Sequence, residues 1–159
     1  MVFVVSGQVG IDLTQTTTVP QHTLGTTVQT TDGGLFEYVQ VLSAVAQYNT
    51  VVINADNKAS NATTTNAAEV KRVGVAQVSI ALSSFGWVQR QGKAIVNVAA
   101  GCQDFVALFT TGTPGVLDDA TVSEALVLGI NTVTSTSTAS AVTAIIGSPA
   151  QIFPFANPA

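Results

Sequence analysis

The sequence is poor in charged and chemically reactive side chains. Only 9% of its 159 residues are Asp, Glu, Lys or Arg, and it has a single His, a single Cys and a single Met. Soluble domains usually carry about 25% charged residues. General acid–base, nucleophilic and metal chemistry all depend on these residue types. We therefore expect no enzyme, no cofactor and no metal site, and a function that lies in surfaces and assembly.

The few reactive residues that are present do not form a catalytic pattern. His22 lies in a Thr- and Gln-rich stretch, away from a nucleophile that it would activate. Cys102 has no base beside it in the sequence and is interpreted as a small buried hydrophobic residue; being alone, it forms no intrachain disulfide. Asp118, Asp119 and Glu124 are the sole acidic grouping. Adjacent side chains of a strand point to opposite faces, so we expect a solvated turn here and not a shared metal ligand set.

The charge distribution excludes two classes of partner. The formal net charge is −4, and the five basic residues all fall between positions 58 and 93. A nucleic-acid-binding protein needs a basic face, which this chain lacks, so no nucleic-acid partner is expected. No run reaches the roughly 18 apolar residues of a membrane span. The apolar run at residues 1–5 is too short for a signal peptide. We expect a soluble protein with no membrane partner, made in a cytoplasm.

The residues that are abundant favour strands. Short Val-, Ile- and Thr-rich segments alternate with Gly, Asn and Asp, while helical periodicity is weak, with one or two turns at most in 120–128. Strands at such spacing are typical of an all-β barrel or sandwich. Asp32-Gly33-Gly34 predicts a hairpin turn, because glycines supply positive φ without strain. Strands are expected at 35–42, 51–53, 70–82, 85–89, 93–98, 104–109, 125–130 and 141–146, with tight turns at 83–84 and 91–92 and an exposed loop at 54–68.

Composition divides the chain into three parts: an extended Thr-rich arm with a first strand at 1–34, a compact β-domain at 35–146, and an extended tail at 147–159. Consecutive threonines favour extended backbone in the arm. The tail holds three of the five prolines, which remove ladder donors and fix φ. The apolar residues of both ends are candidate assembly contacts, namely Val2, Phe3, Val4, Val19, Ile152, Phe153 and Phe155.

The aromatic residues Phe85 and Trp87 stand at the centre of the chain, in the segment that runs from Phe85 to Gly92. We interpret both as anchors of the core. An alternative is a carbohydrate-binding β-module that uses Trp87 as a stacking platform. A buried indole would favour the first interpretation, and an exposed indole beside Asn and Gln would favour the second.

The segment Phe85-Gly86-Trp87-Val88-Gln89 with Gly92, preceded by Val73-Gly74-Val75-Ala76, resembles small virion proteins of tailed bacteriophages. The stretches 22–26, 38–40 and 115–120 add to the resemblance, which covers roughly residues 22–130. It implies a capsid decoration (cement) protein or a related head structural protein with a compact β-domain. Such proteins bind the major capsid protein lattice, commonly as trimers.

The residues and the resemblance together predict a non-enzymatic decoration protein on the outside of the capsid. Binding the assembled lattice and not its separate parts would stabilise the head by mass action. The expected partners are the major capsid protein and further copies of the chain itself, as a homotrimer held by arm and tail. A phage head-fibre or tail component is the alternative within the same class.

Overall fold

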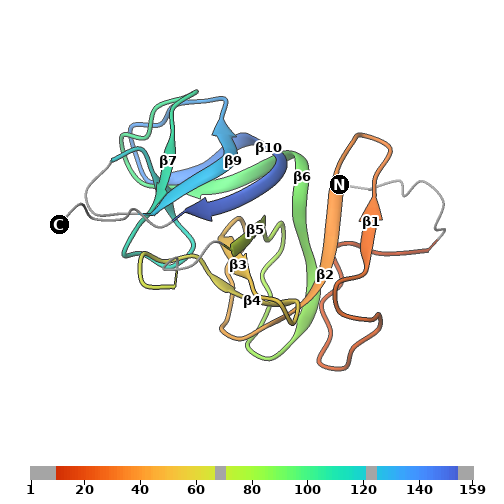
Figure 1. Cartoon of the computed structure of the whole chain (residues 1–159). Coiled ribbons are helices and arrows are strands. Elements are labelled where there is room, and N and C mark those ends of the chain that lie inside the picture. Colours follow the sequence, from red (N-terminus) through yellow and green to blue (C-terminus); the bar gives the residue numbers. More distant parts are fainter. Residues whose placement is uncertain (1–9, 67–70, 121–124, 154–159) are drawn as a thin grey trace.

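A computed structural model describes residues 10–66, 71–120 and 125–153 (Figure 1). In these ranges the chain is all-β, without a helix, and no helix there is long and apolar enough to cross a membrane. The strands are β1 (Thr27–Gln29), β2 (Leu35–Val41), β3 (Thr50–Ile53), β4 (Lys58–Asn61), β5 (Lys71–Val75), β6 (Phe85–Val98), β7 (Leu108–Thr110), β8 (Leu117–Asp118), β9 (Leu126–Thr132) and β10 (Ser140–Phe153). The all-β prediction is confirmed.

Five of the strands close into a barrel. β2 pairs with β4, β4 with β3, β3 with β5, β5 with β6, and β6 returns to β2. Alternate residues of each strand face the interior, as the two-residue period of a strand requires. Val39, Val51, Ile53 and Val88 form the centre of this barrel and are buried. Their branched side chains suit a pleated, packed surface.

A second lobe shares β6 with the barrel. The C-terminal half of β6 pairs with β10, which also pairs with β9, while β7 and β8 link β9 back to the end of β6. The core of this lobe is built from small and branched residues such as Val96, Ala144 and Ile146. Val52 and Val73 join it from the outer face of β3 and β5. The two lobes are therefore packed against each other and not linked only by β6 (Figure 1).

The expected turn at 91–92 is wrong, because β6 runs unbroken through it. Gly92 has φ +96°, and a Cβ on it would lie 3.0 Å from Cα of Gly34 and 3.1 Å from the carbonyl oxygen of Gly33. The pairing of β2 with β6 shifts register beside this point, between Leu35 and Phe36. Gly92 thus bends a continuous strand where the β1–β2 hairpin turn presses against it.

Other boundaries also differ from the expectation. The supposed loop at 54–68 contains β4, and the strand expected at 70–82 ends at Val75. The strand expected at 104–109 begins only at Leu108. The helical turns expected within 120–128 are not formed in its described part, because β9 begins at Leu126; residues 121–124 lie outside the described ranges. The boundary placed at residue 147 falls inside β10, which extends to Phe153.

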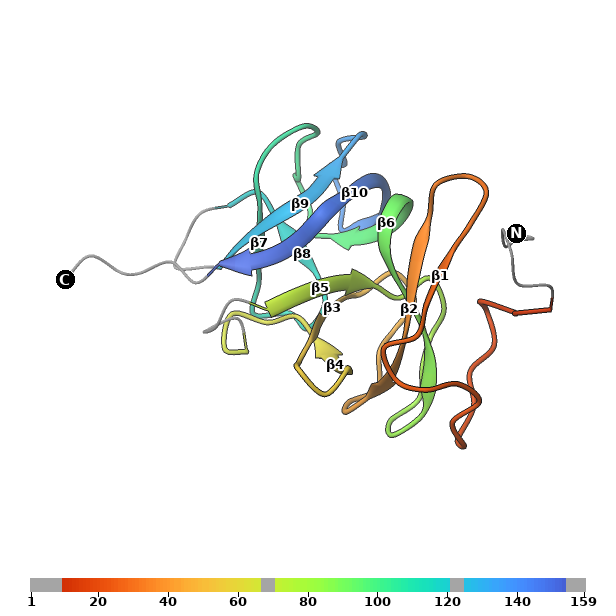
Figure 2. The same cartoon turned by 45° about the vertical axis from the view of Figure 1, so that its right-hand side comes forward.

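The described part of the N-terminal segment, residues 10–34, packs on the chain's own barrel. Thr17 forms a β-bridge with Phe85, and β1 pairs with β2 after the hairpin turn that the sequence predicted. Leu13 and Val28 cover the outer face of β2 and β6, where a third apolar cluster forms. Figure 2 shows this segment along the side of β2 and β6.

Candidate functional site

The indole of Trp87 is buried beneath the N-terminal segment, with 2% of its surface exposed. Its ring centroid lies 5.0 Å from that of Tyr38 and 5.2 Å from that of His22. The hydroxyl of Tyr38 accepts a hydrogen bond from the backbone N–H of Gln21 (3.0 Å), and the ring of Phe85 is stacked with that of Tyr38, with centroids 6.3 Å apart. Trp87 and Phe85 therefore lie in a core, and His22 is an aromatic neighbour in that core. Trp87 offers no face to a sugar.

The structure brings Cys102 close to two carboxylates, which the sequence did not indicate. The Sγ of Cys102 and one carboxylate oxygen each of Asp118 and Asp119 lie within 4.8 Å of one another. Asp118 belongs to β8 and both carboxylates are half-buried, so the expected solvated turn is wrong. Oδ2 of Asp119 accepts the backbone N–H of Gln103 (3.1 Å), and the thiol donates weakly to the Gln103 carbonyl (3.6 Å).

Burial, followed by the negative charges of Asp119 and Asp118, raises the pKa of Cys102 to about 11. Burial also raises the pKa of Asp118. Both effects favour the protonated forms, whereas a metal ligand must lose its proton. The trio supplies three donors, fewer than the four of a structural zinc site. We interpret it as a packed, unreactive group.

Cys102 should consequently resist alkylation in the folded protein. With a pKa of about 11, only about one thiol in a thousand is ionised at pH 8, and the thiolate is the reactive species. We expect iodoacetamide at pH 8 to leave native protein unmodified and to label the same protein completely in guanidinium chloride. Stoichiometric labelling of the native protein within minutes would contradict this assignment; mass spectrometry reads both outcomes.

A buried ion cluster closes one end of the five-strand barrel formed by β2 to β6. Glu37 lies on the inward face of β2 with Val39, and its carboxylate accepts two bonds from Nη1 of Arg72 (2.9 and 3.1 Å) and one from Nη1 of Arg90. Nη2 of Arg72 donates to the carbonyl of Asn54 (3.0 Å) and to Oδ1 of Asn57 (2.7 Å). The carboxylate is saturated by guanidinium donors, so its role is structural. Sequence reasoning did not find this cluster.

Three asparagines tie the lobes together. Nδ2 of Asn97 donates to Oδ1 of Asn49 (2.9 Å), and Nδ2 of Asn49 donates to Oδ1 of Asn61 (2.8 Å) and to the carbonyl of Pro114 (3.2 Å). Gly115 fits against this chain only because it lacks a side chain, since a Cβ there would lie 2.5 Å from Asn49. The network fixes the loop before β8 on the barrel.

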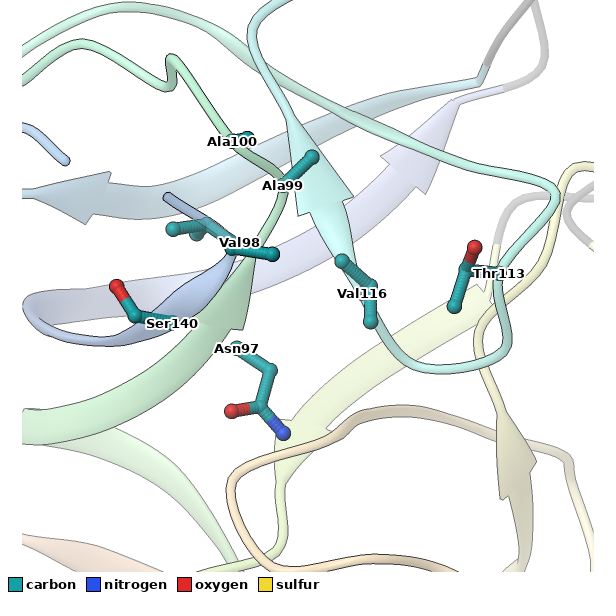
Figure 3. Close-up of a pocket in the computed structure, with 8 residues that line it drawn as sticks. Asn97, Val98, Ala99, Ala100, Thr113, Val116 and Ser140 are labelled. Atoms are coloured by element: carbon teal, nitrogen blue, oxygen red, sulfur yellow. The ribbon is translucent and has the colours of Figure 1, made fainter. Parts of the chain in front are cut away.

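A cavity of about 330 Å³ opens beside this network (Figure 3). It is lined mainly by small residues from the end of β6 and from the loop before β8, including Val98, Ala99 and Val116, with Asn97 and Ser140 at its edge. None of its lining residues is titratable. Among the described residues its lining therefore offers apolar surface with the hydroxyls of Thr113 and Ser140, but no carboxylate, imidazole, amine or thiol.

Of the six exposed large apolar residues in the described part of the chain, three lie in segments beside the ends of β2 and β6; the other three are Phe105, Leu128 and Ile145. Leu42 follows β2, Leu82 precedes β6, and Val19 follows Thr17, which bridges Phe85 at the start of β6. Their exposed fractions are 53%, 62% and 63%. Backbone bonds between Val41 and residues 83 and 84 hold the first two segments side by side. The three segments reach the same end of the molecule in Figures 1 and 2. We call Val19, Leu42 and Leu82 the apolar rim.

The predicted assembly contacts fall into two groups. Val19 is an exposed member of the rim. Ile152 and Phe153 belong to β10, where their backbones pair with Lys71, Val127 and Leu126. Val2, Phe3, Val4 and Phe155 lie outside the described residues. Leu42 and Leu82 were not predicted; each is a large apolar residue next to a strand end, which is the signal that could have identified them.

Comparison with known proteins assigns no family. No protein-family model matches the sequence, and no curated protein is significantly similar to it.

Proposed function

We propose that the chain is a non-enzymatic virion structural protein that binds the outside of a major capsid protein lattice as a decoration protein and stabilises the head. The observation that carries the proposal is the apolar rim, Val19, Leu42 and Leu82, on a surface otherwise poor in charge. Single exposed apolar residues are normal on a soluble domain, whereas a contiguous apolar patch marks an interaction site; the proposal takes the three residues of the rim as parts of one such patch.

The surroundings of the rim suit permanent contact. The neighbouring residues Ala81 and Ser83 are exposed and uncharged. Neutral hydroxyl and aliphatic groups cost less to remove from water than ions do. Full burial of an exposed leucine contributes about 1.5–3 kcal/mol, and since Leu42 and Leu82 are 53% and 62% exposed, covering each would contribute roughly half of that.

The rigid fold supports the same role. Both lobes are closed by strand pairing, and the ion cluster and the asparagine network fix their loops. A preorganised surface loses little conformational freedom on binding. In a trimer on a regular lattice, each modest contact would be repeated, and linked contacts raise the overall affinity well above that of one.

A head-fibre or tail component would use the same kind of surface at another place in the virion. The carbohydrate-binding alternative in its original form, with Trp87 as the platform, is opposed by the burial of that indole. The rim therefore favours assembly over sugar stacking.

The proposal is tested by co-sedimentation with heads purified from the phage that encodes the chain. We expect the double variant Leu42→Asp, Leu82→Asp to bind heads at least tenfold more weakly, because it places charge in the contact. Leu128→Asp, on the exposed side of β9 in the other lobe, is the matched control and should bind normally. A circular dichroism spectrum verifies that each variant is folded. Unchanged binding by the double variant would contradict the rim assignment, and no binding by the unmodified chain would contradict the decoration role.

A further inference from the structure

A second cavity, of about 300 Å³, lies where the β1–β2 turn, the bend in β6 and β10 meet. Asp32 contributes from the turn, Gln89, Lys93 and Ile95 from β6 on both sides of Gly92, and Thr143 from β10. It shares none of its lining residues with the apolar rim. Unlike the cavity beside Asn97, it is lined by charged residues, Asp32 and Lys93.

Gln89 supplies a fixed acceptor in this cavity. Its side chain is 3% exposed, and its Nε2 donates to the carbonyl oxygens of Gln91 (3.0 Å) and Lys93 (2.9 Å) across the bend in β6. Both amide protons are therefore used. Within the described part of the chain its Oε1 accepts no hydrogen bond, although the residue lines the cavity. Among the described residues this oxygen is not one of the fully buried side-chain atoms that lack a partner, so it is accessible from the cavity and can accept a hydrogen bond from a ligand there.

The outer part of the cavity holds opposite charges that remain unpaired. Asp32 and Lys93 are both exposed and both line the cavity, yet they form no ion pair with each other. Oδ1 of Asp32 accepts bonds from the hydroxyl of Thr30 and from the N–H of Gly34 (3.4 Å), which fix its orientation. The hydroxyl of Thr143 has no hydrogen-bond partner among the described residues. Donors and acceptors thus surround the opening.

The wall between these groups is aliphatic and neutral. Ala94 and Ile95 line it, and both amide atoms of Gln77 are occupied by the backbone of Ile95 (3.1 and 3.3 Å). The charged groups sit at the exposed edge, while the buried polar group is a neutral amide. A ligand that placed its own charge deep in the cavity would lose hydration without an opposite charge to replace it. The deep part of the ligand must therefore be neutral and able to donate a hydrogen bond.

We propose that this cavity binds a neutral sugar unit. A pyranose hydroxyl both donates and accepts, so one ring can donate to Oε1 of Gln89 and to Asp32 while accepting from Lys93. The C–H face of the ring then packs on Ile95, whose side chain lies on the face of β6 opposite to the core residue Ala94. This site goes beyond the decoration role: a capsid-bound copy would present it as a separate glycan-binding site, independent of Trp87.

The test is a ¹H–¹⁵N NMR titration of the full chain with glucose, galactose, N-acetylglucosamine and rhamnose. We expect at least one of these sugars to shift the amide signals of Gln89, Lys93 and Thr143, with a Kd in the millimolar range. Lys93→Ala and Thr143→Val should each weaken that binding roughly fivefold, the value of one hydrogen bond. Lys58→Ala and Thr27→Val, which change the same residue types away from the cavity, should bind like the unmodified chain.

Three outcomes would overturn the proposal: no shift at these residues with any of the four sugars, equal weakening by the control variants, or tighter binding of glycine than of every sugar at the same signals. The last result would identify a site for a charged ligand instead. Lys93 and Thr143 lie partly at the surface, so both test variants are expected to fold.

Discussion

Replacing Glu37 with alanine should lower the free energy of unfolding by about 3–5 kcal/mol. The change leaves two guanidinium groups without their shared carboxylate at the end of the barrel. Arg90 is affected most, because only 14% of its side chain is exposed and its Nε already lacks a partner. A buried, uncompensated charge is among the most destabilising defects a mutation can produce. Urea unfolding followed by circular dichroism measures the loss.

Two further variants separate charge from packing in the same cluster. Arg72→Ala should cost less than Glu37→Ala, since the Arg72 side chain is 39% exposed and Arg90 would still neutralise the carboxylate. The triple variant Glu37→Leu, Arg72→Met, Arg90→Met should be more stable than Glu37→Ala, because it removes every charge of the cluster together. A loss below 1 kcal/mol for Glu37→Ala would show that the cluster is solvated and does not close the barrel.

Trp87→Ala should destabilise the protein by a similar amount, about 3–5 kcal/mol. The indole fills the space between β2, β6 and the N-terminal segment, and its removal leaves a cavity bordered by Tyr38 and His22. Trp87→Phe keeps most of the apolar volume and should lose less. Chemical unfolding of the three proteins gives the comparison.

Trp87 also reports directly on its own burial, because it is the only tryptophan in the sequence. We expect its fluorescence in the native protein to be resistant to quenching by iodide and to become accessible on unfolding. Full quenching in the native state, or a stable Trp87→Ala variant, would instead indicate an exposed ring and restore the sugar-stacking alternative.

The elements that the sequence predicted well are those in which local pattern and tertiary environment agree. The segment Leu35–Val41 has apolar residues on both faces and is covered on both, by the barrel interior and by the N-terminal segment. Asp32-Gly33-Gly34 forms the expected hairpin turn, with Gly33 at φ +86°. In both places the tertiary contacts reinforce the backbone conformation that the neighbouring residues favour.

The predictions that were wrong concern places where contacts between residues far apart in the sequence determine the backbone. Gly92 has the positive φ that a turn would require, but the packing of Gly34 on it makes a bend in a long strand instead. The Gly147–Pro149 segment was interpreted as the start of a tail. In the structure a register shift between Ile146 and Gln151 accommodates it within β10, consistent with the tolerance of proline at irregular points of a sheet.

The candidate sites were harder to predict than the fold for the same reason. Glu37 lies on the same face of β2 as Val39, and its partners Arg72 and Arg90 lie 35 and 53 residues away along the chain. Asp119 meets Gln103 across 16 residues. Of the apolar rim, Val19 was predicted, whereas the adjacency of Leu42 and Leu82 depends on the pairing of β2 with β6.

The proposed role includes a phage origin, and its most direct measurement is a cryo-electron microscopy reconstruction of intact heads of the phage that this proposal requires. We expect density for the two-lobed β-domain at symmetry-related positions on the outer surface of the capsid lattice, with Val19, Leu42 and Leu82 facing the major capsid protein. An outer surface without this domain would contradict the decoration role, and a domain bound there with the rim facing solvent would contradict the rim as its contact surface.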